Sequence, residues 1–120
     1  MKFVVLMAEE DPESWDRATQ AYRDEVFERH RAFDRAARER GEILGGEALA
    51  FPKEAVTLQP ARGGERLVTE GPYTESAEQL GGFYLLDVDS QETALELARL
   101  LPEGYSVEVR PVIQIAGYDG

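Results

Sequence analysis

Hydrophobic and polar residues follow two different periods along the chain, and these periods predict its first two elements. At Phe3–Ala8 apolar residues occupy both alternating sets, which indicates a strand that is covered on both faces. Asp11 followed by Pro12 is typical of a helix N-terminus, because proline at the first helical position loses no hydrogen bond. We expect this helix to run to about Arg40 and to stop at Gly41. Its apolar stripe repeats at helical spacing: Trp15, Ala18, Tyr22, Val26, Phe33 and Ala37.

The middle of the chain carries shorter candidates for strands. Ile43–Leu49, Ala55–Gln59 and Arg66–Thr69 have strand-like patterns. Between the last two, Arg62-Gly63-Gly64-Glu65 is typical of a hairpin turn. Thr74–Gln79 is predicted to form a single helical turn.

A central strand and a second helix follow. Gly82–Val88 is apolar on both faces, as expected of a strand in the middle of a sheet. Either Asp89 or Ser90 caps the helix, and with Asp89 as the cap, Glu92 takes the third helical position of a capping box. We expect Pro102 and Gly104 to end the helix. Its buried stripe is predicted to be Ala94, Leu97, Ala98 and Leu101.

The last predicted strand, Tyr105–Ile115, has the clearest alternation in the chain. One face is expected to meet the core, and the other to meet water, a pocket or a partner. The core-facing set is Tyr105, Val107, Val109, Ile113 and Ile115, and the opposite set is Ser106, Glu108, Arg110 and Gln114.

The order of these elements predicts an α+β fold. Two strand–helix–strand halves are the ferredoxin-like plan, in which both helices lie on one face of an antiparallel sheet. The other face would then expose an apolar patch, which a second copy of the sheet would cover. We therefore predict a homodimer. The residues expected in this patch are Tyr84, Leu86, Val88 and Val112.

Composition narrows the class of protein. With 120 residues and 42% hydrophobic content, residues 1–120 are expected to form one domain. The net charge of −11 argues against nucleic acid and anionic membranes as partners, and it is most simply a solubility feature. The first apolar run, Phe3–Ala8, is shorter than the roughly 7 to 15 residues of a signal-peptide core, and no run approaches the roughly 18 residues of a membrane span. We therefore expect a cytoplasmic protein.

Metal and nucleophile chemistry have little support in the sequence. The chain has no cysteine, so disulfides, thiolate metal sites and cysteine nucleophiles are excluded. The carboxylate clusters Glu9-Glu10-Asp11 and Asp87-Val88-Asp89 lack a recognisable ligand spacing and are interpreted as surface charge. We expect no metal and no cofactor. Gly81 and Gly82 are interpreted as permitting close backbone approach or a bulge, because no phosphate-loop pattern accompanies them.

His30, the only histidine, is the first candidate for catalysis. It lies about 60° from the centre of the apolar stripe, at the edge of the packed face. A histidine there can act as a general acid or base if a carboxylate fixes its tautomer. Asp34 is one helical turn further on, and Glu70 would have to approach through the fold. The alternative is that His30 only bridges helix and sheet by a hydrogen bond.

Four other side chains have two interpretations each. Glu70 precedes a Gly-Pro turn and either holds the loop or projects into a cavity. Tyr73 and Tyr84 either line a ligand pocket or belong to the core or a dimer interface. Arg110 either binds an anionic ligand or pairs with Glu108 or a partner subunit.

Several of these motifs resemble the DGPF subgroup of the YCII-related proteins. The resemblance is carried by Glu70-Gly71-Pro72-Tyr73, by Glu78-Gln79-Leu80-Gly81-Gly82-Phe83-Tyr84 and by Val107-Glu108-Val109-Arg110-Pro111-Val112, and it extends over nearly the whole chain. The usual Asp-Gly-Pro-Phe is Glu-Gly-Pro-Tyr here, which moves the carboxylate by one methylene. His30 resembles a first-helix histidine of the wider family, which is proposed there as half of a His–Asp pair.

The resemblance implies a fold and two classes of function. Family members are small ferredoxin-like proteins that pair into dimeric α/β barrels. One implied function is a cofactor-independent enzyme that transfers protons on a small aromatic or anionic molecule, with His30 as base and Glu70 or Asp34 orienting it. The alternative is a non-catalytic dimeric accessory module, since DGPF relatives often accompany alternative sigma factors. A purely structural dimer, without an enclosed pocket, is a third possibility.

Overall fold

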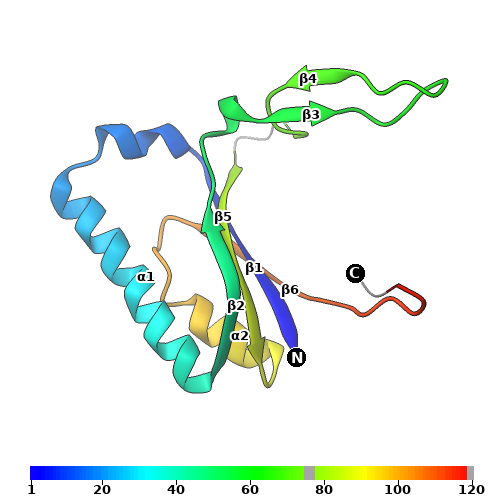
Figure 1. Ribbon diagram of the computed structural model, residues 1–120. Coiled ribbons are helices and arrows are strands. Elements are labelled where there is room, and N and C mark those ends of the chain that lie inside the picture. The colour runs from blue at the N-terminus through cyan, green and yellow to red at the C-terminus, as the bar shows by residue number, and fades with distance from the viewer. Residues whose placement is uncertain (75–77, 119–120) are drawn as a thin grey trace.

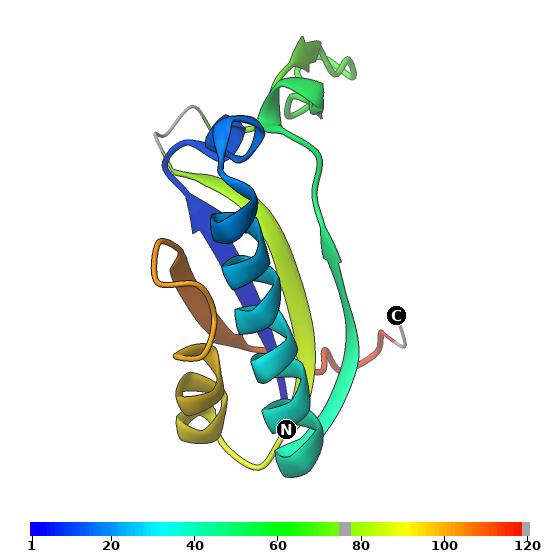
Figure 2. The same cartoon turned by 90° about the vertical axis from the view of Figure 1, so that its left-hand side faces the viewer.

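The structure, a computed structural model, describes residues 1–74 and 78–118. One sheet is four-stranded and antiparallel with the order β2-β5-β1-β6, and both α-helices cover one of its faces (Figures 1 and 2). The predicted α+β class is confirmed, and the arrangement is consistent with the ferredoxin-like plan. In chain order the elements are β1 (Lys2–Glu9), the 3-10 helix η1 (Pro12–Arg17), α1 (Gln20–Arg40), β2 (Gly41–Ala48), the 3-10 helix η2 (Pro52–Glu54), β3 (Val56–Leu58), β4 (Val68–Glu70), β5 (Gln79–Val88), α2 (Gln91–Ala98) and β6 (Ser106–Pro111).

The core lies between the sheet and the two helices. Burial of apolar side chains there makes the main favourable contribution to the free energy of folding and holds the helices on the sheet. The buried cluster contains Phe3, Val5, Met7, Phe33, Ala37, Leu86, Val88, Ala94, Leu97, Ala98 and Leu101.

The sequence assigned the two faces of β5 wrongly. Leu86 and Val88, expected on an exposed patch, are buried beneath the helices. Leu86 pairs directly with Phe3 across the sheet, and paired residues share a face, so the apolar set of β1 fixes which face of β5 is buried. The uncovered face carries instead the half-buried side chains of Val4, Leu6, Phe83 and Leu85.

The predicted first helix is two helices. η1 is followed by an extended residue, Ala18, with ψ of 148°. Thr19 then caps α1, because its hydroxyl accepts a hydrogen bond from the Tyr22 N–H at 3.1 Å. Asp11 makes no such cap with its side chain. The break lets Trp15 pack edge-on against Phe27, with ring centroids 5.5 Å apart.

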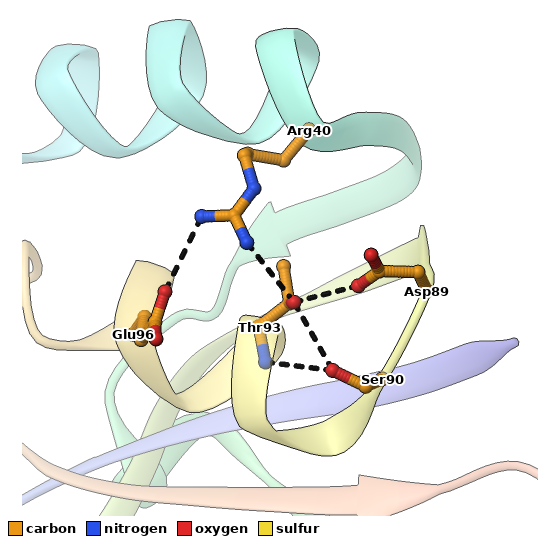
Figure 3. A network of polar contacts seen from close by, with 5 residues as sticks. All are labelled: Arg40, Asp89, Ser90, Thr93 and Glu96. Atoms are coloured by element: carbon orange, nitrogen blue, oxygen red, sulfur yellow. Dashed lines mark hydrogen bonds and ion pairs between the residues drawn. The ribbon is translucent and has the colours of Figure 1, made fainter.

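A polar network joins the end of α1 to the start of α2 (Figure 3). Ser90, one of the two predicted caps, accepts a hydrogen bond from the Thr93 N–H at 3.1 Å, so Glu92 is not in a capping box. The buried Thr93 hydroxyl donates to Asp89 at 2.6 Å and accepts from Arg40 at 3.2 Å. Arg40 also forms an ion pair with Glu96, so its side chain links the end of α1 to two residues of α2.

β6 is shorter than predicted. It ends at Pro111, and the Val112 N–H donates to the carbonyl of Lys2, the first residue of β1, at 2.9 Å. Ile113 and Ile115, expected in the core, are exposed because they lie beyond the ladder.

β3 and β4 form a separate two-stranded arm, which we define as residues 55–71. The predicted hairpin turn is confirmed: Gly63 and Gly64 both have positive φ, and Arg62 and Glu65 bond to each other's backbone. The predicted helical turn at 74–79 includes residues 75–77, which lie outside the described residues, and Gln79 already belongs to β5. Figure 1 shows the arm and the residues after β6 extending to the side of the sheet opposite the helices.

Within the described part of the chain, no helix has the length and apolar character that crossing a membrane requires.

Candidate functional site

A cavity of about 470 Å³ lies between the first half of α1, η1 and one end of the sheet. Its wall is mostly apolar, and it is rich in aromatic rings. The aromatic residues of the lining are Trp15, Phe27, Phe51, Phe83, Tyr84 and Tyr105, and its other ionisable side chains are Glu9, His30 and Glu47.

Glycines shape the cavity at two places. Gly81 is the extra residue of a β-bulge, since Met7 pairs with Gly82 and the next residue of β1 pairs with Leu80. A Cβ at Gly81 would lie 3.1 Å from a carboxylate oxygen of Glu9. A Cβ at Gly46 would lie 2.8 Å from the ring of Tyr84. Of the two predicted roles of the Gly81-Gly82 pair, close backbone approach or a bulge, the bulge is confirmed.

His30 lies half-buried between two tyrosine hydroxyl groups. Its Nδ1 is 2.7 Å from the hydroxyl of Tyr84, and its Nε2 is 3.4 Å from the hydroxyl of Tyr105. Burial lowers the pKa of His30 below its ordinary value, and the nearby charge of Asp34 only partly opposes this effect. The imidazole is therefore neutral near pH 7, with one ring nitrogen donating a hydrogen bond and the other accepting one.

The two tyrosines stay protonated over the whole physiological range. Burial, followed by the charge of Asp34, raises the pKa of Tyr84 to about 12. Burial, followed by the Glu9 carboxylate, raises the pKa of Tyr105 further. Tyr84 is also held by Phe33, whose ring centroid lies 4.5 Å away. The three polar rings therefore form a neutral, ordered chain along the cavity wall.

Glu9 is the more buried of the two carboxylates in the cavity wall. It is half-buried, and burial, followed by the charge of Asp11, raises its pKa. Among the residues that the structure describes, none forms an ion pair or a side-chain hydrogen bond with Glu9. The sequence had assigned it to surface charge. Its position beside Gly81 follows from the pairing of β1 with β5, which the sequence alone does not show.

The structure brings together only some of the predicted site residues. Tyr84 contacts His30, but the ring of His30 has no hydrogen bond to a carboxylate within the described ranges. The Asp34 side chain is 45% exposed and pairs with Arg38 at 3.7 Å. Glu70 is exposed on β4, in the arm and outside the cavity.

A second, more open hollow of about 1080 Å³ lies between the uncovered face of the sheet and the arm. Tyr73 and Arg110, two predicted ligand-binding residues, line this hollow and not the cavity. Tyr73 is 89% exposed, and Arg110 forms an ion pair with Glu108, one of the predicted alternatives. Residues 49–52 line both spaces, so this segment is a shared wall.

The described residues contain no group of three or more His, Cys, Asp or Glu side chains arranged to hold a metal ion.

Two comparisons relate the chain to known proteins. The model of the YCII-related domain matches residues 1–116. An uncharacterized protein of Rhizobium meliloti (strain 1021) is 42% identical to the chain over 73 residues. The match covers 58% of this chain and 59% of that relative, so the chain spans less than two thirds of the relative's length.

Proposed function

The chain belongs to the YCII-related family, and on that premise we propose that it binds a small, largely apolar organic molecule in the cavity and transfers a proton on it without a cofactor. The observation that carries this proposal is the position of His30. It is neutral, half-buried in the wall of a cavity and hydrogen-bonded at both ring nitrogens. These are the conditions under which an imidazole acts as a general base near neutral pH.

The two hydrogen bonds of His30 suggest how it would act. In the proposed tautomer, Nδ1–H donates the shorter hydrogen bond to the oxygen of Tyr84, which leaves the lone pair on Nε2. The longer contact, between Nε2 and Tyr105, is weak enough for a bound molecule to replace it. Nε2 would take a proton from one atom of the molecule and return it to another, as in an isomerisation. Tyr84 then has the orienting role that the sequence offered to Asp34 or Glu70.

The composition of the wall favours some ligands over others. Among the described residues that line the cavity there is no lysine or arginine. This gives little support to the anionic ligand considered from the sequence, because Arg110 lies outside the cavity. Aromatic or aliphatic molecules with few polar groups fit the wall better.

A homodimer and membership of the DGPF subgroup are part of the proposal. The uncovered face of the sheet carries Val4, Leu6, Phe83 and Leu85, and a second sheet placed on this face would form the dimeric α/β barrel. In the subgroup motif, Gly71 has φ of 96°, which explains why this position takes glycine.

A non-catalytic accessory module remains the second candidate. The observation in its favour is the arm, whose apolar side chains are exposed and offer a surface to another protein. Under this alternative the cavity binds a ligand, or none, without turnover.

Phenylacetone in D₂O provides a direct test, because exchange of its acidic methylene protons for deuterium is proton transfer itself. Binding is followed by the fluorescence of Trp15, the only tryptophan of the chain, which lies in the cavity wall. We expect quenching together with accelerated exchange, loss of exchange in His30→Gln, and no change in Glu70→Gln, whose side chain lies in the arm.

The outcomes separate the two candidates. Binding without exchange would contradict the catalytic proposal and favour the accessory module. Failure of phenylacetone, 2-phenylethanol and phenylacetate alike to change Trp15 fluorescence would contradict ligand binding in the cavity.

A further inference from the structure

We propose that the cavity selects organic cations. Glu9 would be the counter-ion of the cationic group, and the aromatic side chains of the wall would contact the apolar part of the ligand. The inference rests on the binding function proposed above and names its ligand class, an ammonium or amidinium group attached to an apolar skeleton.

The first step of the argument is the sign of the charges in the wall. The charged side chains of the described lining are carboxylates, Glu9 and Glu47, while His30 is neutral. The whole chain carries a net charge of −11, which at long range favours the approach of cations over that of anions. An anion would meet repulsion, and a neutral molecule would gain at most a hydrogen bond to a carboxylate, without the attraction between opposite charges.

The second step is the unpaired state of Glu9. Several exposed carboxylates of the described residues, such as Glu28 and Glu103, form ion pairs with arginine side chains. Glu9 is more buried than these, yet among the described residues it has no ion-pair or side-chain hydrogen-bond partner. A half-buried carboxylate without a partner is costly to the fold, and a bound cation would offset that cost.

The third step is the space made for this carboxylate. The bulge residue of β5, Gly81, has no side chain. A Cβ at this position would lie 3.1 Å from a Glu9 oxygen. The carboxylate therefore lies against bare backbone at the cavity wall and not against an apolar side chain. Its raised pKa agrees with this burial beside the Asp11 charge.

The aromatic wall completes the site. Ring faces attract cations through their quadrupole, most strongly those of tryptophan. The chain's own cations already show this attraction here, since the Arg23 guanidinium lies 5.3 Å from the ring centre of Trp15 and the Lys53 ammonium 5.7 Å from that of Phe51. A carboxylate with several rings around one cavity is the combination that recognises ammonium groups.

Three probes of similar size test the proposal: 2-phenylethylammonium, 2-phenylethanol and phenylacetate. Each is titrated into the full chain at neutral pH and followed by Trp15 fluorescence. We expect the cation to bind about tenfold more tightly than the alcohol, as a charge-assisted hydrogen bond implies, and the anion to bind most weakly.

Two matched variants identify the counter-ion. Glu9→Gln should remove the preference for the cation while the alcohol binds as before. Glu10→Gln changes the net charge equally at an exposed neighbour outside the cavity, and should leave the preference intact.

Each outcome decides between the proposals. Equal or tighter binding of the alcohol, or a cation preference that survives Glu9→Gln, would overturn the cation inference and leave the binding function standing. Absence of binding by all three probes would overturn both.

Discussion

The helix-covered side of the sheet and the arm differ in where their apolar side chains lie. Phe33 of α1 is 0% exposed, whereas in the arm Leu67 is 69% and Val68 is 64% exposed. On the helix-covered side, the hydrophobic side chains are buried by contacts within the same chain. The arm displays them, which is expected of a segment that folds onto another molecule.

This difference indicates which residues serve stability and which serve association. Side chains on the helix-covered side should contribute mainly to the free energy of unfolding of the single chain. Side chains of the arm should contribute mainly to the dissociation constant of the proposed dimer. Substitutions chosen from each region can break or sharpen this division.

The largest effect is expected from Phe33→Ala. The substitution empties a fully buried position and removes the ring that packs on Tyr84, so it should lower the free energy of unfolding by about 3–5 kcal/mol. Urea denaturation measures this loss. Leu95→Ala, on the exposed side of α2, is the control and should cost clearly less. Similar losses for both would contradict the core assignment.

Leu58→Ser should act on association rather than on folding. Leu58 is exposed in the arm and lines the second hollow, so its loss should weaken the proposed dimer about tenfold, or ~1.4 kcal/mol. Sedimentation equilibrium measures the dissociation constant. Leu95→Ser, at a comparably exposed position on the helix side, should leave it unchanged. A monomeric wild-type protein would refute the dimer itself.

Gly71→Ala should destabilise the base of the arm by about 1 kcal/mol, because a side chain is strained at its φ of 96° although nothing obstructs it. The N–H of residue 71 bonds to the Ala55 carbonyl at 2.7 Å, so its hydrogen exchange should accelerate. Gly104→Ala is the control, since that glycine has open space and no positive φ. Unchanged exchange at residue 71 would contradict the strain.

Glu9→Gln is expected to stabilise the chain modestly at neutral pH. The pKa of Glu9 is raised by folding, so its favourable contribution exists below the unfolded value of 4.5 and is lost as pH rises through the folded value. Removing the charge should therefore raise the free energy of unfolding at pH 7 and not at pH 4. A stability gain that accompanies loss of cation binding is typical of a functional residue. Destabilisation at pH 7 would contradict the burial of the charge.

His30 should produce the opposite pH dependence. Its pKa is lowered by folding, so its contribution is present above the unfolded value of 6.5 and is lost as pH falls through the folded value. The stability difference between wild type and His30→Gln should shrink from pH 7.5 to pH 5. NMR titration of this sole imidazole gives the folded pKa directly. A pKa at or above 6.5 would exclude the neutral, buried histidine described here.

The sequence predicted elements whose signals are local. The hairpin turn at Gly63 and Gly64 was predicted because glycine adopts positive φ readily. Ser90, the N-cap of α2, was one of the two adjacent residues predicted to cap this helix. The first helix was mispredicted because Asp11 and Thr19 precede two separate helices, η1 and α1, and the extended residue between them lies within a sequence of helical periodicity.

The parts that the sequence missed depend on pairing between distant segments. Both alternating sets of β5 are apolar, so only its register with Phe3 shows which set is buried. Glu9 and Tyr105 lie at opposite ends of the chain and line one cavity because β1 pairs with β6. His30 was found because it is unique, but its tyrosine partners come from other elements.

The wall formed by residues 49–52 has a thermodynamic consequence. It lines the cavity on one side and the hollow beneath the arm on the other, so a ligand and a partner subunit would contact the same four residues from opposite sides. Linkage requires any effect between the two events to be reciprocal: a ligand that tightens the dimer by some factor is bound more tightly by the dimer by that same factor. For such a ligand, the affinity measured on this protein would vary with protein concentration. Dilution would weaken ligand binding, because it converts the dimer into the monomer.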